Sequence, residues 1–288
     1  MSYPKISFEF FPPKTLEASF RLWDCMSMLS PLDPEFVSVT YGAGGTTRAL
    51  TQDAVSTIRN TTDLRVAGHL TCVDASREET LDVARNYAAA GVTDIVALRG
   101  DPPKGASNFE ARPDGFASSI ELIEALTQMN RFTIRVGAYP EKHPESPSTA
   151  TDIDWLKRKI DAGASSAITQ FFFEAETFFR FRDACDKAGI TAPIIPGILP
   201  IENWSGAQRF AKTCGTSIPT VIADAFTNAE RDGTSDLLAT AVASELCDEL
   251  IEGGVEHLHF YTLNKPELTR DVCRALGIVP STNLQEVA

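Results

Sequence analysis

The sequence has no apolar stretch that approaches the roughly 20 residues needed to span a bilayer, and its first residues lack the basic start and apolar core of a signal peptide. It also has few basic residues, with 26 lysines and arginines against 39 acidic residues and a formal charge of −13. No run of lysine or arginine would follow a nucleic acid backbone. We therefore expect a cytoplasmic protein whose partners include neither nucleic acid nor a membrane.

The cysteines are scattered along the chain and histidines are few, which disfavours disulfide and metal frameworks. The six cysteines form no CxxC pair and no spacing typical of a zinc site, so we expect them to be reduced and structural. Of the four histidines, His257 and His259 would share one face of a strand. A metal pair there is conceivable, but no nearby carboxylate or thiol completes a ligand set, and we predict no metal site.

Three motifs of phosphate binding and nucleophilic catalysis are absent too. There is no GxGxxG after the first predicted strand, no GxxxxGK[ST] and no GxSxG, which disfavours a Rossmann nucleotide site, a P-loop and an α/β-hydrolase triad. A Schiff-base lysine of the aldolase type would be expected on a strand. Lys157 and Lys159 instead fall in a helical pattern set by Ile153, Leu156 and Ile160.

Short β-rich runs alternate with amphipathic helical patterns along the whole chain, and no linker or low-complexity tract interrupts them. The predicted strands cover residues 5–10, 36–40, 65–70, 94–98, 133–138, 167–171, 193–198 and 257–261. The predicted helices cover residues 77–90, 118–129, 151–162, 175–188 and 203–213, followed by a longer helical region before the last strand. In a chain of 288 residues with 43% hydrophobic content, this order predicts an α/β fold, a (β/α)8 TIM barrel forming a single domain over residues 1–288.

Polar residues two apart recur at the ends of the first four predicted strands. The pairs are Ser7 and Glu9, Ser38 and Thr40, His69 and Thr71, and Arg99 and Asp101. Residues two apart share one face of a strand, and the carboxyl ends of barrel strands build the active site. The opposite faces, which we expect to pack beneath the helices, carry Ile6, Phe8, Phe10, Val37, Val39, Leu70, Val96 and Leu98. The four pairs therefore predict a polar pocket in the barrel mouth.

Glu9 lies in an aromatic run, Ser7-Phe8-Glu9-Phe10-Phe11-Pro12-Pro13, whose two prolines must end the strand. Burying an unpaired carboxylate is costly, so such a group usually raises its pKa. A Glu that stays protonated near neutral pH can act as a general acid. The alternative is a Glu at a strand end that simply reaches solvent, and this segment alone leaves both open.

Two further segments place polar groups beside the predicted pocket. In Arg99-Gly100-Asp101, the glycine would let a flat ligand approach the main chain and the carboxylate could accept hydrogen bonds, although a local ion pair in a turn is the alternative. Residues 139–144 gather an aromatic ring, two potential cations and a carboxylate in one short loop. Loops at this end of a barrel are often functional.

The ordered motifs of the chain resemble those of the methylenetetrahydrofolate reductase family, in its short bacterial form. The resemblance runs from near residue 5 to near residue 278. The motifs that carry it are Ser7-Phe8-Glu9-Phe10-Phe11-Pro12-Pro13, Val37-Ser38-Val39-Thr40-Tyr41-Gly42-Ala43, His69-Leu70-Thr71-Cys72, Val96-Ala97-Leu98-Arg99-Gly100-Asp101, Ala138-Tyr139-Pro140, Asp161-Ala162-Gly163-Ala164, Ile168-Thr169-Gln170-Phe171-Phe172-Phe173, Pro196-Gly197-Ile198-Leu199-Pro200 and His259-Phe260-Tyr261-Thr262-Leu263-Asn264.

This resemblance implies an FAD-dependent oxidoreductase that interconverts methylenetetrahydrofolate and methyltetrahydrofolate. The FAD would take a hydride from NADH or NADPH and pass it to the folate in a two-step, ping-pong mechanism. The residues that match FAD-binding positions are Thr40, Tyr41, Ala43, His69, Leu98, Arg99, Gly100, Asp101, Phe116, Ala117, Tyr139 and His143. The residues that match positions around the nucleotide part of FAD are Asp152, Arg158, Lys159 and, as a packing position, Ala164.

The resemblance also implies catalytic and substrate roles. Glu9 would protonate a folate nitrogen and so open the methylene bridge to the reactive iminium, while Asp101 would tune the flavin potential. Arg99 and Lys159 would offset the charge of the pyrophosphate. The positions that match substrate contacts are Glu9, Thr40, Asp101, Gln170 for the pterin, Phe210 for stacking, and Lys265, which replaces the Arg of some bacterial relatives.

A flavin-free barrel of the methyltransferase class, or a folate-binding protein without redox activity, is the second hypothesis, because a Glu and a Gln in a polar mouth could bind a pterin alone. Residues 99–101 and 139–143 disfavour it, since a pterin needs no pyrophosphate site. The resemblance further implies a homo-oligomer, either a dimer or a tetramer. It also implies that the regulatory domain of eukaryotic relatives, and control by S-adenosylmethionine, are absent. The choice between NADH and NADPH stays open.

Overall fold

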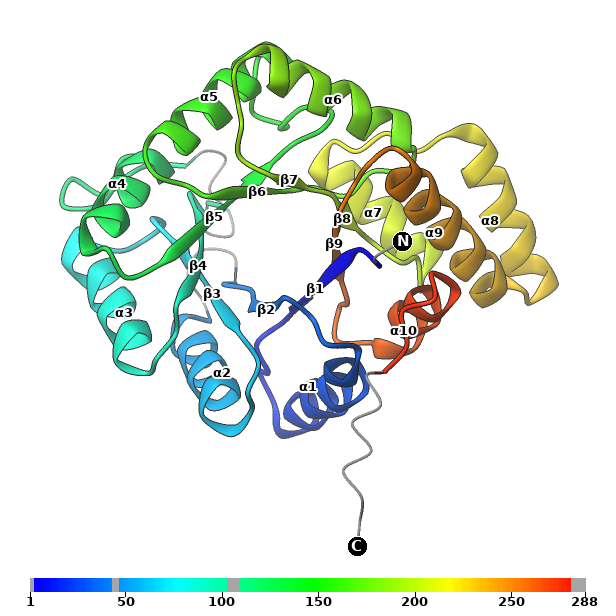
Figure 1. Ribbon diagram of the computed structural model, residues 1–288, viewed down its shortest axis with the longest axis horizontal. Helices are drawn as coiled ribbons and strands as arrows, with labels where there is room; N and C mark the ends of the chain where they lie inside the picture. Colours follow the sequence, from blue (N-terminus) through cyan, green and yellow to red (C-terminus); the bar gives the residue numbers. More distant parts are fainter. Residues whose placement is uncertain (1–2, 43–46, 103–108, 281–288) are drawn as a thin grey trace, which may run out of the picture.

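The computed structural model describes residues 3–42, 47–102 and 109–280, and its strands form a ring enclosed by helices (Figure 1). The strands are β1 (Lys5–Phe10), β2 (Phe36–Val39), β3 (Val66–Thr71), β4 (Asp94–Leu98), β5 (Thr133–Ala138), β6 (Ser166–Thr169), β7 (Ile194–Ile195), β8 (Gly197–Ile198) and β9 (His257–Tyr261). They form one sheet in the order β7-β6-β5-β4-β3-β2-β1-β9-β8, with parallel pairing throughout. The predicted α/β barrel is confirmed.

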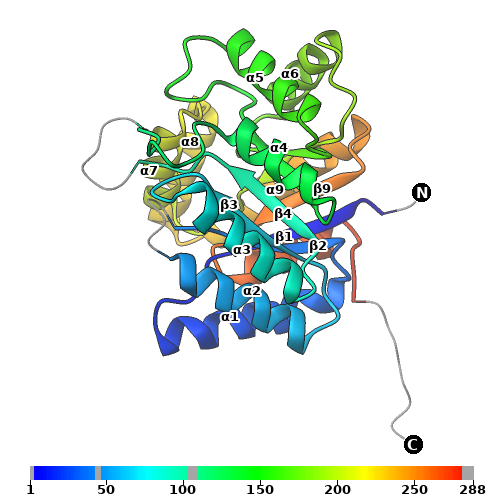
Figure 2. The same ribbon diagram turned by 90° about the vertical axis from the view of Figure 1, so that its left-hand side faces the viewer.

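The helices lie outside the ring, and Figure 2 shows α1, α2, α3 and α4 following one another along its outer surface. The helices are α1 (Leu16–Leu29), the 3-10 turn η1 (Ser30–Leu32), α2 (Arg48–Thr61), α3 (Arg77–Ala89), α4 (Ser119–Met129), α5 (Thr149–Asp161), α6 (Ala175–Lys187), α7 (Trp204–Cys214), α8 (Thr220–Asp232), α9 (Ser235–Glu252) and α10 (Pro266–Ala275). The five predicted helices are confirmed to within two residues at each end. The longer helical region before the last strand consists of α8 and α9.

The predicted strand over residues 193–198 is divided in two by Pro196. Proline has no backbone N–H, so it cannot continue a strand ladder as a donor. β7 pairs with β6, whereas β8 pairs with β9, and the Pro196 carbonyl accepts a hydrogen bond of 3.0 Å from His259 N. The two short strands therefore occupy the place of the single predicted strand, with β7 paired to β6 and β8 paired to β9 in the ring.

The loops at the carboxyl ends of the strands are fixed by local signals at the helix termini. Ser76 and Glu79 form a capping box that starts α3 directly after β3. Gly215 ends α7 with a φ of 73°, a left-handed conformation that glycine adopts without steric cost. These two signals fix where α3 begins and where α7 ends.

Buried apolar side chains form two layers, one between the helices and the sheet and a smaller one inside the barrel. We expected Val96 and Leu98 beneath the helices, and this prediction is wrong, because both belong to the inner cluster with Phe36. Side chains two apart on β4 point to the same face, so Asp94, Val96 and Leu98 all point into the barrel. Asp94, two residues before Val96, is fully buried and accepts a hydrogen bond of 3.0 Å from Arg135, whose guanidinium lies 4.0 Å from the Phe36 ring centroid inside the barrel.

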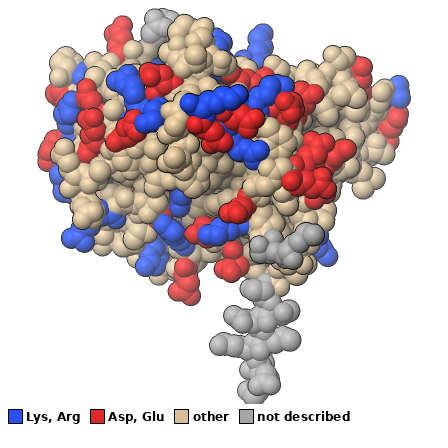
Figure 3. All heavy atoms as spheres, turned by 45° about the horizontal axis from the view of Figure 1, so that its top comes forward, with Lys and Arg blue, Asp and Glu red and all other residues tan. Residues whose placement is uncertain are grey.

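The surface carries charges of both signs. On the face shown in Figure 3, the Lys and Arg side chains are interspersed with Asp and Glu side chains and form no continuous basic tract. In the part of the chain that the structure describes, no helix combines the length and the apolar character required to cross a membrane.

Candidate active site

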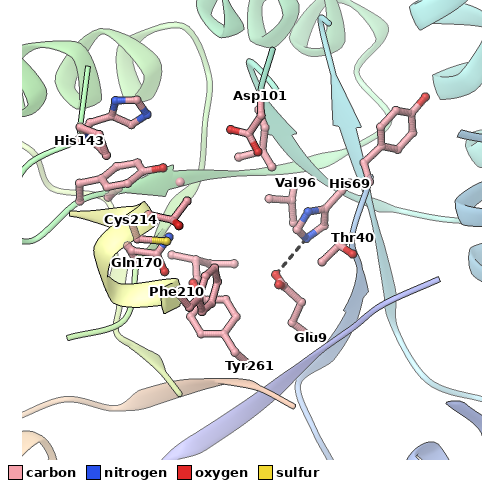
Figure 4. Close-up of a pocket in the computed structure, with 18 of the residues that line it drawn as sticks. Glu9, Thr40, His69, Val96, Asp101, His143, Gln170, Phe210, Cys214 and Tyr261 are labelled. Atoms are coloured by element: carbon pink, nitrogen blue, oxygen red, sulfur yellow. Dashed lines mark ion pairs between the residues drawn. The ribbon is translucent and has the colours of Figure 1, made fainter. Parts of the chain in front are cut away.

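A cavity of about 430 Å³ opens at the carboxyl ends of the strands, where the sequence predicts a polar pocket (Figure 4). The residues of the predicted site that line it are Glu9, Thr40, Tyr41, His69, Leu98, Asp101, Tyr139, His143, Gln170 and Phe210. They come from loops and strands far apart in the sequence. The barrel topology brings them together because all parallel strands end at the same rim.

Glu9 faces this cavity from β1, and its side chain is 16% exposed. His69 Nε2 lies 3.3 Å from Glu9 Oε2, and His259 Nε2 lies 3.8 Å from the same oxygen. Burial raises the pKa of the Glu9 carboxyl, but the charge of His69 and the interactions with His259 outweigh it and lower this pKa from 4.5 to about 2. The inward orientation of Glu9 is confirmed, whereas the expected rise in its pKa is wrong for this structure.

The two histidines of β9, His257 and His259, which the sequence analysis considered as metal ligands, both contact a serine hydroxyl. His257 Nε2 and His259 Nδ1 both contact Ser7 Oγ, at 2.9 Å and 2.7 Å. Residues 3–42, 47–102 and 109–280 contain no group of three or more His, Cys, Asp or Glu side chains that could hold a metal ion.

Tyr261 lines the cavity as well, although the sequence reasoning did not select it as a site residue. Its hydroxyl donates a hydrogen bond of 2.6 Å to the Thr169 carbonyl. The register pairs Tyr261 with Glu9, and the period of two along His257, His259 and Tyr261 gave the signal that could have found it.

Gln170 and Phe210 lie across the cavity from Glu9 (Figure 4). The Gln170 Oε1 atom accepts a hydrogen bond of 3.0 Å from Phe171 N. Phe210 stacks on Phe171 with ring centroids 5.0 Å apart, yet remains 38% exposed. Cys214, one turn further along α7, also lines the cavity and was not predicted. This wall therefore offers an exposed aromatic face and an amide to a flat ligand.

A second cavity of about 420 Å³ adjoins the first, and Tyr41, Leu98, Asp101, Tyr139 and His143 line both. The predicted residues that line the second cavity alone are Arg99, Gly100, Asp152 and Lys159. The shared lining makes the two cavities one elongated site, with Glu9 at one end and charged side chains of both signs, Lys159 and Asp152 among them, toward the other.

Lys159 reaches the second cavity from α5, although it belongs to a helix rather than to a strand. Its ammonium donates a hydrogen bond of 2.9 Å to the Gly137 carbonyl. Burial lowers the pKa of Lys159 from 10.5 to about 8. No carboxylate in the described ranges lies within ion-pair distance of this ammonium, so the cavity holds a buried cation that lacks a close counter-ion.

Arg99 pairs with Glu145 rather than with the adjacent Asp101, so the local ion pair considered from sequence is not what forms. Two hydrogen bonds of 2.6 Å and 3.1 Å join the guanidinium to the Glu145 carboxylate, which also lines both cavities. Gly100 has a φ of 88°, and a Cβ atom there would lie 2.7 Å from Val73 Cγ1. Only glycine suits this turn.

The loop after β5 holds His143 against Tyr139, with ring centroids 4.6 Å apart. Asp152 accepts a hydrogen bond of 2.9 Å from His143 N and thereby ties the loop to α5. Burial and the charge of Arg99 lower the pKa of His143, which favours the neutral imidazole.

Several predicted site residues do not line either cavity. Phe116 is buried beneath the Arg77 guanidinium, Ala117 N donates a hydrogen bond of 3.3 Å to Glu121, and Arg158 lies on the Trp155 ring. Ala164 is buried in the core cluster. Lys265 forms an ion pair of 2.8 Å with Glu202. Ala43 lies outside the described residues.

Sequence comparisons relate the chain to one enzyme family. Residues 2–277 match the profile of the family described as methylenetetrahydrofolate reductase. The 5,10-methylenetetrahydrofolate reductase of Escherichia coli K12 is 45% identical over 276 residues, covering 96% of this chain and 91% of that protein. A protein of Oryza sativa subsp. japonica, named a probable methylenetetrahydrofolate reductase (NADH), is 33% identical, and the match covers 96% of this chain but 49% of that protein.

Solved structures share the fold at low sequence identity. An uncharacterized protein from Clostridium thermocellum, described as binding two copies of 5-methyl-5,6,7,8-tetrahydrofolic acid, superposes with a TM-score of 0.61 at 16% identity, covering 96% of this chain and 95% of that chain. An oxaloacetate acetylhydrolase superposes with a TM-score of 0.53 at 13% identity, covering 92% of this chain and 77% of that chain. At these identities the likeness supports the barrel fold alone.

Proposed function

The chain belongs to the methylenetetrahydrofolate reductase family, and from that premise we propose that it reduces methylenetetrahydrofolate to methyltetrahydrofolate with NADH or NADPH, using FAD as its cofactor. The proposal depends most on one observation, that the Glu9 cavity adjoins a second cavity that is lined by the buried Lys159 ammonium and the Arg99 guanidinium. The chemistry that FAD supplies when bound is hydride transfer from the nicotinamide nucleotide to the folate in two separate half-reactions.

The residues of the second cavity suit FAD. The buried Lys159 ammonium can face a pyrophosphate and has no close carboxylate partner among the described residues, whereas the Arg99 guanidinium would face it beside its carboxylate partner Glu145. Gly100 lets the backbone approach a flat ring closely. Thr71 lines this cavity, and its Oγ1 is buried without a hydrogen-bond partner in the described structure, which leaves its hydrogen-bonding capacity unused.

We propose that Glu9 delivers the proton that the reaction consumes. The overall reaction takes one hydride from the nicotinamide nucleotide and one proton from water for each folate reduced. The neighbouring histidines favour the ionised form of Glu9, so Glu9 must gain a proton as the substrate covers it. Covering removes water from the carboxylate, which raises its pKa and favours the acid.

Gln170 and Phe210 would orient the folate opposite Glu9. An exposed aromatic face can stack on the pterin or on the adjoining benzoyl ring, and the Gln170 amide can pair with pterin nitrogens and oxygen. Lys265 would reach the substrate carboxylates only after leaving its ion pair with Glu202. This arrangement places the acid and the orienting residues on opposite walls of one cavity.

The test is turnover by the purified protein. With FAD, methylenetetrahydrofolate and NADH or NADPH, we expect methyltetrahydrofolate, identified by mass spectrometry, and no product when FAD is removed. A protein that forms no product with either nucleotide contradicts the proposal. Tight binding of methyltetrahydrofolate without FAD binding would instead support the flavin-free, pterin-binding barrel.

A further inference from the structure

A row of polar side chains, Glu9, His259, Ser7 and His257, runs inside the barrel from the Glu9 cavity toward the amino ends of the strands. Ser7 Oγ lies between two imidazoles, 2.7 Å from His259 Nδ1 and 2.9 Å from His257 Nε2. Ser7 and His259 are fully buried. β1 and β9 hold the row in register, because Ser7 pairs with His259 and Glu9 pairs with Tyr261.

The two ends of this row differ in their surroundings: the upper end lies at the barrel mouth, at Glu9, and the lower end lies at the amino ends of the strands. At the upper end, His259 Nε2 is buried, has no hydrogen-bond partner among the described residues, and lies 3.8 Å from Glu9 Oε2. That separation is about 1 Å longer than the roughly 2.8 Å of a charge-assisted hydrogen bond. At the lower end, His257 is half-buried at the start of β9, opposite the mouth, and pairs with Lys5, whose side chain is 63% exposed.

Packing fixes both imidazoles. The Phe36 ring stacks on His259 with centroids 5.6 Å apart and meets His257 edge-on at 5.8 Å. The Arg135 guanidinium lies over the same Phe36 ring. Burial, together with the charges of His259, Arg135 and Lys5, lowers the pKa of His257 from 6.5 to about 3. His257 is thus neutral near pH 7, with one nitrogen free to accept a proton while the other donates one.

We propose that His257, Ser7 and His259 form a proton path that reloads Glu9 from solvent at the amino end of the barrel. This inference rests on the proposed function, in which each turnover consumes one proton at Glu9. A solvent water gives a proton to His257 Nδ1 and leaves as hydroxide, the His257 Nε2 proton moves to Ser7 Oγ, the Ser7 hydroxyl proton moves to His259 Nδ1, and the His259 Nε2 proton moves to the Glu9 carboxylate. Both imidazoles end in the opposite tautomer and regain the first one by proton exchange with water before the next turnover. Four bonds to hydrogen form and four break, counting the one lost by water, so protons balance without a redox step.

A path from the opposite end of the barrel would keep Glu9 supplied with protons while ligands fill the mouth. Cofactor and folate in the elongated cavity would lie between Glu9 and the solvent at the mouth, because Glu9 is already only 16% exposed there. A route through the opposite end lets the acid regain its proton while the mouth is covered. Ser7 and the two histidines are therefore positioning and relay groups, and of these four residues only Glu9 meets the folate.

The experiment follows the two half-reactions of His257→Ala and His257→Gln separately. For both variants we expect reduction of the flavin by the nicotinamide nucleotide at the wild-type rate. Oxidation of the reduced enzyme by methylenetetrahydrofolate should slow about 10-fold or more, within the scale of general acid–base catalysis. Imidazole in the buffer should restore His257→Ala, whose vacated site can admit it, but not His257→Gln, whose side chain fills the site and cannot relay a proton.

The matched control is Ser166→Ala, which removes a hydrogen bond of 3.1 Å from Arg135 at the same end of the barrel but leaves the row intact. It should keep both half-reactions and show no response to imidazole. A readout without cofactor comes from ¹⁵N NMR of the apoprotein, in which His257→Gln should shift the His259 ring nitrogens and Ser166→Ala should not.

Wild-type folate half-reactions in both His257 variants would overturn the path, as would a loss that imidazole does not restore in His257→Ala. If His257→Ala does not fold, a wild-type folate half-reaction in His257→Gln still overturns it. If the wild-type protein does not reduce methylenetetrahydrofolate, the proposed function is wrong, and Glu9 then has no proton to supply. If the wild type reduces the folate and the His257 variants do so equally fast, the function stands and only the proton path is wrong.

Discussion

Replacing His257 with Gln should make the folded protein less sensitive to acid. Burial and the neighbouring charges lower the pKa of His257 from 6.5 to about 3, so between these values the unfolded chain binds the proton and the folded chain does not. Stability therefore falls as the pH drops below about 6.5. Between pH 7 and pH 5 this one group removes about 2 kcal/mol from the free energy of unfolding of the wild type. Gln does not titrate, so the variant lacks this loss.

The assay is urea unfolding of wild type and His257→Gln at pH 7 and at pH 5. With a denaturant slope of roughly 3 kcal/mol per M, the wild-type midpoint should fall about 0.7 M further than that of the variant. Protein concentration and flavin content are kept equal, because binding shifts apparent stability. Ser166→Ala is the control and should keep the wild-type pH dependence, since it removes a hydrogen bond and no titrating group. Equal midpoint shifts in His257→Gln and wild type would show that His257 does not cause the loss of stability in acid.

Four further outcomes are expected. Glu9→Gln should keep flavin reduction by the nicotinamide nucleotide and lose folate reduction by about 10²-fold or more in stopped-flow half-reactions; an equal loss in both would make Glu9 a flavin-site or structural residue. Lys159→Met should weaken FAD binding about 10- to 100-fold by titration, the scale of a lost hydrogen bond to a charged group, and an unchanged affinity would remove Lys159 from the cofactor site. Gly100→Ala should reduce the free energy of unfolding by about 1–2 kcal/mol and so lower the melting temperature, because φ is 88° and Val73 crowds the new Cβ; an unchanged melting temperature would show that the turn adapts. Light scattering should give the mass of a dimer or a tetramer, and a monomer at all concentrations would contradict the expected oligomer.

The sequence predicted the barrel well because both of its periodicities are strong. Period-two runs and amphipathic helical patterns alternate without a break, and most strand ends agree with the structure within two residues. The divided strand at Pro196 was missed because proline removes one donor without changing the local β pattern. Val96 and Leu98 were placed on the wrong face because apolar character alone does not distinguish a barrel interior from a helix-covered exterior. Their true face depends on the buried contact of Asp94 with Arg135, a partner in another strand.

The candidate site was predictable to the extent that strand ends define it. Glu9, His69 and Gln170 line one cavity, as expected from their positions at carboxyl ends. The protonation state of Glu9 was not predictable, because the lowering of its pKa comes from histidines on β3 and β9 that only the closed ring brings near. The partner of Arg99 was missed for the same reason, since Glu145 follows a different strand.

Anaerobic mixing of the flavin-loaded protein with the two proposed substrates in turn tests the proposed reaction step by step. NADH or NADPH should bleach the visible flavin absorbance, and methylenetetrahydrofolate added afterwards should restore it with release of methyltetrahydrofolate. A protein that binds no flavin, or whose bleached flavin is not reoxidised by methylenetetrahydrofolate, is not a flavin-dependent methylenetetrahydrofolate reductase.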